Sequence, residues 1–133
     1  MKALEIEWPG GEHAFRLRLG EIEAVQESTG CGPEFLLNAF RIGAWKVAHA
    51  EEVLKFGLVG GGMPRDEAKR LIRATFDRGF GIAHYKPACM MILEAALFGP
   101  EDDPVGKPEA PVTEPSETRT DAGSSAASTS SDA

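Results

Sequence analysis

Residues 88–98 read Ala-Cys-Met-Met-Ile-Leu-Glu-Ala-Ala-Leu-Phe, and Glu94 is the only charged side chain among them. Pro87 before this run and Gly99 after it are typical of the beginning and the end of a helix. A helix that is apolar on nearly every face is tolerated only at the centre of a core or under a partner. The run is also well short of the ~20 residues that span a bilayer. It therefore predicts a central helix of a small domain and no membrane insertion.

The segment before this run predicts further short helices. Pro64 opens the clearest amphipathic stretch, in which apolar residues recur at helical spacing, namely Ala68, Leu71, Ile72 and Phe76. Two earlier helices are expected from Gly20 to Gly30 and from Pro33 to Gly43. A third helix is expected to end at Gly57, with residues 60–62 as a flexible break.

The N-terminal residues show the two-residue period of a β-hairpin. Residues 3–8 and 13–19 alternate around Pro9-Gly10-Gly11, with the inward positions Leu4, Ile6, Trp8, Phe15, Leu17 and Leu19. A lone hairpin is marginal in water, so its apolar face must pack against helices. The predicted fold class is α+β and predominantly α-helical, with an N-terminal β-hairpin followed by four or five short helices.

The composition changes abruptly after Phe98. Residues 99–133 contain no aromatic residue, Leu, Ile or Met, and they carry eight acidic and two basic side chains. Since the whole chain has 21 acidic and 14 basic residues, the first 98 residues are nearly neutral. We expect a domain over residues 1–99 and a disordered, acidic, Pro/Ser/Thr/Ala-rich tail over residues 100–133. A nearly neutral domain has no general attraction for phosphate backbones, so non-specific nucleic-acid binding is not expected to be its main role. No specific nucleic-acid partner is expected either.

Catalytic and metal-binding motifs are missing from the sequence. Cys31 and Cys89 are far apart and lack Cys-x-x-Cys spacing, so they are interpreted as core thiols in a reducing cytoplasm. No serine lies between Ser28 and Ser116, and no His-Glu-x-x-His motif is present. The sequence predicts a cytoplasmic protein that is not an enzyme and needs neither metal nor cofactor.

Two segments allow alternative interpretations. The glycine-rich run 57–63 could present backbone N–H groups to a phosphate, but it lacks the Lys-Ser/Thr pair of a P-loop. A flexible helix connector is the preferred interpretation. The helix after Pro64 has a basic flank formed by Lys69, Arg70, Arg73 and Arg78, which leaves a small DNA-binding regulator as an alternative to a solvated, ion-paired face.

The methionines of the last predicted helix indicate a partner-binding role. Flexible thioethers suit an interface that accommodates irregular apolar helices. Such a helix can bury one face internally and offer the other to a partner. The candidate partner-binding residues are Trp45, Met90, Met91, Leu93, Leu97 and Phe98.

The order of these segments resembles a known family over residues 3–99. The resemblance is carried by Gly-Leu-Val-Gly-Gly-Gly-Met at 57–63, by Glu67-Ala68 and by Ala-Ala-Leu-Phe-Gly at 95–99. On these residues the chain resembles the gene transfer agent family of small phage-like proteins, which is grouped with phage tail assembly chaperones.

This resemblance implies a tail assembly chaperone that coats the apolar helix of a tape measure protein before the tail tube forms. The implied partners are the tape measure protein and the tail tube protein, and self-association is a further option. Family members have also been described as tail tube subunits, so a minor tail or tail tube component is an alternative. Tube subunits of that kind are rich in β-strand, and one hairpin is too little strand, so we rank this alternative second.

Overall fold

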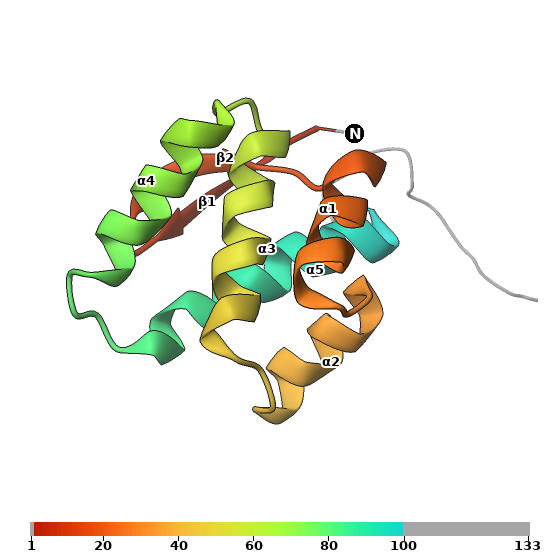
Figure 1. Ribbon diagram of the computed structural model, residues 1–133. Coiled ribbons are helices and arrows are strands. Elements are labelled where there is room, and N and C mark those ends of the chain that lie inside the picture. Colours follow the sequence, from red (N-terminus) through yellow and green to blue (C-terminus); the bar gives the residue numbers. More distant parts are fainter. Residues whose placement is uncertain (1, 100–133) are drawn as a thin grey trace, which may run out of the picture. The chain divides into compact units, whose positions relative to one another are not determined.

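The computed structural model describes residues 2–99 (Figure 1). Its elements follow in the order β1 (Leu4–Trp8), β2 (Gly11–Phe15), α1 (Leu19–Thr29), α2 (Pro33–Ile42), α3 (Val47–Gly60), α4 (Arg65–Phe76), the 3-10 helix η1 (Ile82–Tyr85) and α5 (Lys86–Phe98). The predicted fold class is confirmed, because an N-terminal hairpin precedes five α-helices. The tail predicted over residues 100–133 lies outside the described residues. No helix in the described part is both long and apolar enough to cross a membrane.

The hairpin is antiparallel and its register runs from Leu4↔Phe15 to Trp8↔Gly11. Its second strand begins two residues earlier than predicted and ends at Phe15. The chain leaves the sheet there because the Arg16 N–H donates to the Gly57 carbonyl oxygen of α3, at 2.9 Å. The apolar face of the hairpin packs against the helices, as the alternating pattern predicted.

Leu19 corrects the predicted strand pattern, because its side chain is 71% exposed and opens α1 instead of extending the hairpin. The first turn of α1 is held by Arg18 and Glu21. The Glu21 carboxylate accepts bonds from the Arg18 N–H at 2.8 Å and from the Arg18 Nε at 2.9 Å. The side-chain bond from Arg18 lowers the pKa of Glu21 below its usual value. This capping contact starts the helix one residue before the predicted position at Gly20.

The boundaries of α1 and α2 agree with the sequence signals. Gly30 and Gly43 follow the two helices with φ of 75° and 78°, in the left-handed region that favours glycine. The Gly30 N–H returns to the Gln26 carbonyl oxygen, and Gly43 closes α2 in the same way. Pro33 occupies the first turn of α2, where its missing N–H costs no hydrogen bond.

The glycine-rich run behaves differently from the predicted flexible connector. Helix α3 continues through Gly57 and ends at Gly60. A Cβ on Gly57 would lie 2.9 Å from the Phe15 ring, and one on Gly60 would overlap the Arg16 carbonyl. A Cβ on Gly61 would overlap the Ala14 carbonyl. Gly60 and Gly61 therefore let the backbone of residues 14–16 lie directly against the end of α3, and Gly57 leaves room for the Phe15 side chain. We call these three glycines the glycine seat.

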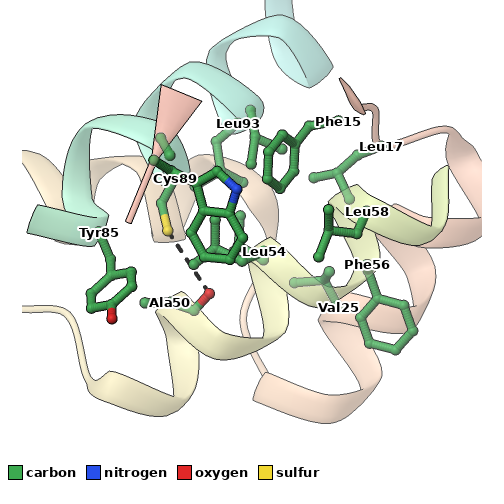
Figure 2. Packing of buried hydrophobic residues seen from close by; sticks show 14 of the residues in the cluster. Phe15, Leu17, Val25, Ala50, Leu54, Phe56, Leu58, Tyr85, Cys89 and Leu93 are labelled. Atoms are coloured by element: carbon green, nitrogen blue, oxygen red, sulfur yellow. Dashed lines mark hydrogen bonds between the residues drawn. The ribbon is translucent and has the colours of Figure 1, made fainter. Parts of the chain in front are cut away.

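The core surrounds α3, and α5 packs against both α2 and α3 (Figure 1). Figure 2 shows Leu93 of α5 and Phe15 of β2 among the buried side chains, with Leu54 of α3 nearby. The Cys89 Sγ also faces α3, at 3.8 Å from the Ala50 carbonyl oxygen. The predicted central position of the last helix is thus confirmed for its inner face.

Tyr85 joins α4 to the start of α5. Its ring stacks on Phe76 with centroids 4.0 Å apart, and its hydroxyl donates to the Thr75 carbonyl oxygen at 3.2 Å. Trp8 meets the same ring edge-on at 6.3 Å. This aromatic cluster lies at the end of η1, an element that no pattern in the sequence predicted.

Candidate functional site

The side of α5 that points away from the core carries apolar side chains. Met91 is 45% exposed, Phe98 is 74% exposed, and Ala95 is half-buried between them. Their spacing of four and three residues places them on one face of the helix. We call Met91, Ala95 and Phe98 the outer face of α5.

An ion pair lies beside the outer face. The Arg41 Nη2 of α2 is 3.4 Å from the Glu94 Oε2 of α5, and both side chains are about half exposed. An ion pair in such a solvated position contributes at most about 1 kcal/mol. The pair marks the border between α2 and α5, and its carboxylate is the only charged group of α5 beyond its first residue.

The six predicted partner-binding residues occupy different depths. Leu93 is fully buried in the core and has no accessible surface. Its predicted role in partner binding is therefore corrected to a role in core packing. Met90 and Leu97 are half-buried against the core. Trp45 is also half-buried and stacks on Phe40 with ring centroids 5.2 Å apart. Met91 and Phe98 are the exposed members of the set.

Two apolar side chains of α2 are exposed and were not among the predicted partner-binding residues. Phe35 fits the apolar stripe of the helix predicted from Pro33 to Gly43, but the structure exposes it together with Ile42. The two residues are seven positions apart and therefore share a helix face. Their heptad spacing was the available signal, since the buried residues of α2 fall on another face, at Leu36, Leu37, Ala39 and Phe40.

The basic flank of α4 carries neighbours of opposite charge. Arg73 lies 3.6 Å from Glu51 of α3, and Lys55 lies 3.1 Å from Glu52 within α3. A cavity of about 230 Å³ between the two helices is lined by Glu51, Glu52, Lys55, Lys69, Ile72 and Arg73. This mixture of signs agrees with the ion-paired interpretation of the flank and gives no continuous basic surface along the cavity.

Two of the three histidines have structural hydrogen bonds. His49 is buried near the start of α3, where its Nδ1 accepts the Lys46 N–H at 3.2 Å. Burial lowers the pKa of His49, and the Lys46 charge lowers it further. The His13 Nδ1 accepts the Trp8 indole N–H at 2.9 Å. In both rings Nδ1 is therefore the acceptor of a hydrogen bond within the fold.

The cysteines are free thiols at different depths. Cys89 is fully buried, and burial raises the pKa of its thiol far above the usual value, whereas Cys31 is half-buried. The predicted core position is therefore confirmed for Cys89, and Cys31 lies at the border of the core. Within residues 2–99, no group of three His, Cys, Asp or Glu side chains is arranged to hold a metal ion.

Comparison with protein families places the described residues in a phage tail family. Residues 2–99 match the family described as "Phage tail tube protein, GTA-gp10", which is the same span that the structure describes. Searches among curated proteins and among solved structures returned no match. Because the family match covers well over half of the 133 residues and agrees with the resemblance found from the sequence, this chain belongs to the GTA-gp10 family of phage tail tube proteins.

Proposed function

We propose that this protein is an assembly chaperone of a phage-type tail and that it binds the tape measure protein before the tail tube closes around it. Membership of a phage tail family supports a role in the tail. The observation that carries the step to a chaperone is the outer face of α5, where Met91 and Phe98 leave apolar surface exposed on a rigid helix.

The outer face has the spacing of one side of a helix–helix contact. Apolar residues separated by four and then three positions form the seam along which two helices pack. Ala95 at the centre lets a partner backbone approach closely, while Phe98 provides a large apolar contact. Met91 has a flexible side chain that adapts to different apolar neighbours along a long helix.

The helical fold also favours a chaperone over a structural subunit. The described residues contain a single two-stranded sheet with strands of five residues, and the remaining elements are helical. A tube wall formed by paired strands requires more sheet than this part of the chain supplies. An exposed helix face, in contrast, needs no further element to bind another helix.

Co-expression with the tape measure protein of the same gene cluster tests this proposal. We expect the two proteins to co-purify at about 0.1 M and at about 1 M salt, because apolar contacts are not screened by ions. Replacing Met91 and Phe98 together by Glu is expected to abolish co-purification and to leave the tape measure protein insoluble.

Leu19→Glu is the control for a charge placed on an exposed apolar residue, because Leu19 of α1 is 71% exposed, close to the 74% of Phe98. This variant is expected to bind as the unmodified chain does. Full tape measure binding by a folded Met91→Glu/Phe98→Glu variant would refute the use of the outer face. Circular dichroism and thermal melting verify that both variants are folded.

The second candidate function is a component of the tail tube, which the description of the matched family favours. Mass spectrometry of purified mature particles separates the two candidates. A chaperone leaves the tail before maturation, so its peptides should be missing from the particles. Retention at the copy number of the tube subunits would establish the second candidate instead.

A further inference from the structure

The outer edge of β1 is open in the described part of the chain. The sheet has two strands, and no backbone hydrogen bond joins β1 to any described element except β2. The opposite edge of the hairpin lies against α3, where the chain just after β2 donates from Arg16 to Gly57. One strand edge is thus covered by the glycine seat, and the other remains available for pairing.

The register identifies which backbone groups point outward. In a two-residue hairpin the pair next to the turn, Trp8↔Gly11, is hydrogen-bonded, and bonded and non-bonded pairs then alternate. Glu5 and Glu7 therefore fall in non-bonded pairs, and their N–H and C=O groups point away from β2. Both side chains are exposed.

A cavity of about 430 Å³ lies at the end of this edge. It is lined by Glu7, Trp8, Pro9, Phe80 and His84. Adjacent strand residues point to opposite faces, so a cavity that touches both Glu7 and Trp8 lies at the edge or end of β1. Phe80 reaches it from the segment between α4 and η1 and is 44% exposed. It is an open depression in the surface, and its volume is large enough for a bulky apolar side chain.

The charges beside this edge favour a basic occupant. Glu7 lies directly opposite Glu12 in the register, and like charges in such a pair repel each other. A second copy of this chain that paired through β1 would bring further glutamates against Glu5 and Glu7. Lysine or arginine on an added strand would instead relieve the repulsion, so charge complementarity selects a basic strand from another protein.

We propose that the outer edge of β1 and the adjoining cavity bind an extended segment of a partner protein that alternates basic and apolar residues. The segment adds as a third strand beside β1, its basic side chains face Glu5 and Glu7, and a large apolar side chain enters the cavity at Phe80. This surface is separate from the outer face of α5, and the inference does not depend on the proposed chaperone function.

The test uses the full-length, ¹⁵N-labelled chain and a synthetic acetylated peptide, Lys-Val-Lys-Val-Lys-Phe. Titration is expected to shift the NMR signals of Glu5, Glu7, Phe80 and the Trp8 indole, and to slow hydrogen exchange of the Glu5 and Glu7 amides. A peptide with Glu in place of Lys should not bind. A peptide with alternate N-methylated amides should bind about ten-fold more weakly or not at all, because it cannot complete the ladder.

Surface variants separate strand addition from general attraction between charges. Glu5→Lys/Glu7→Lys and Phe80→Ala are each expected to weaken peptide binding about ten-fold or more. Glu23→Lys/Glu27→Lys on α1 makes the same change in charge at exposed positions and should leave binding within about two-fold. The proposal would be overturned if the Lys peptide did not bind, or if its NMR shifts were confined to other elements. It would also be overturned if the α1 variant lost as much affinity as the β1 variant, or if the N-methylated peptide bound equally well.

Discussion

The glycine seat and the outer face of α5 contrast in composition and in burial. The glycine seat has no side chains, yet the chain of β2 covers it so closely that added Cβ atoms would overlap carbonyl groups at Gly60 and Gly61 and crowd the Phe15 ring at Gly57. The outer face has large apolar side chains, yet Met91 and Phe98 remain exposed. Hydrophobicity alone therefore does not decide which surface of this protein is covered. The shape of the neighbouring chain decides it.

The largest expected effect comes from filling the glycine seat. Gly60→Ala places a methyl group against the Arg16 carbonyl and 3.0 Å from the Glu21 Oε1, so the hairpin must move. We expect a loss of about 3 kcal/mol or more in the free energy of unfolding, measured by urea denaturation.

Gly20→Ala is the control for Gly60→Ala. Gly20 lies in α1, and a Cβ there would meet no other residue within 4 Å. It should leave stability unchanged or raise it by about 0.5 kcal/mol. Similar stabilities for the Gly60→Ala and Gly20→Ala proteins would show that the hairpin does not rest on α3 as described.

The two sides of α5 provide the next test. Leu93→Ala empties a fully buried site and is expected to cost about 3 kcal/mol in the free energy of unfolding. Met91→Ala, two residues earlier on the outer face, should change it by less than about 0.5 kcal/mol. Thermal or chemical denaturation of the two variants measures the difference. Equal losses would mean that the outer face is covered in the free protein.

A buried hydroxyl in α4 allows a stabilising change. The Thr75 Oγ1 is fully buried and has no hydrogen-bond partner among the described residues. Thr75→Val keeps the shape and removes the unpaired polar atom, so we expect a gain of about 1 kcal/mol in the free energy of unfolding. Thr29→Val is the control, because the Thr29 hydroxyl donates to the Val25 carbonyl oxygen at 2.7 Å. Its removal loses this hydrogen bond and should lower the free energy of unfolding. A destabilised Thr75→Val protein would show that the Thr75 hydroxyl does have a hydrogen-bond partner.

The smallest effect is a pH dependence centred on His49. Because the pKa of His49 is lowered by burial and by Lys46, the unfolded chain binds this proton more readily than the folded chain. The stability that neutral His49 contributes is present above the ordinary histidine value of 6.5 and is lost as the pH falls through the lower folded pKa.

Urea denaturation between about pH 7 and about pH 5 measures this loss. It should stay below about 1 kcal/mol, because the bond from the Lys46 N–H to His49 is a helix cap and caps contribute about that much. His49→Gln removes the titrating group and should flatten that part of the pH profile. An unchanged profile in His49→Gln would assign the dependence to other groups.

The sequence by itself determined the elements whose signals are local. Gly30 and Gly43 end α1 and α2, and Pro33 and Pro64 lie at the starts of α2 and α4, because backbone freedom and a missing N–H act on the nearest turn. The hairpin, the central last helix and the family resemblance followed from local patterns in the same way. The exposed members of the candidate site, Met91 and Phe98, were also among the residues predicted from composition.

Only the tertiary structure decided which of several similar residues is covered. Met91 and Leu93 are both apolar and nearly adjacent, yet one is exposed and the other buried, because α2 and α3 cover a single side of α5. Leu19 and Phe35 fit buried stripes in the sequence, but no described element lies over them closely enough to bury them. Gly57 and Gly60 carry the local signal of a helix end, but both lie within α3. The Phe15 ring occupies the space beside Gly57, and the Arg16 carbonyl occupies the space beside Gly60. Contacts between segments distant in sequence set these outcomes, and local periodicity does not encode which segments will meet.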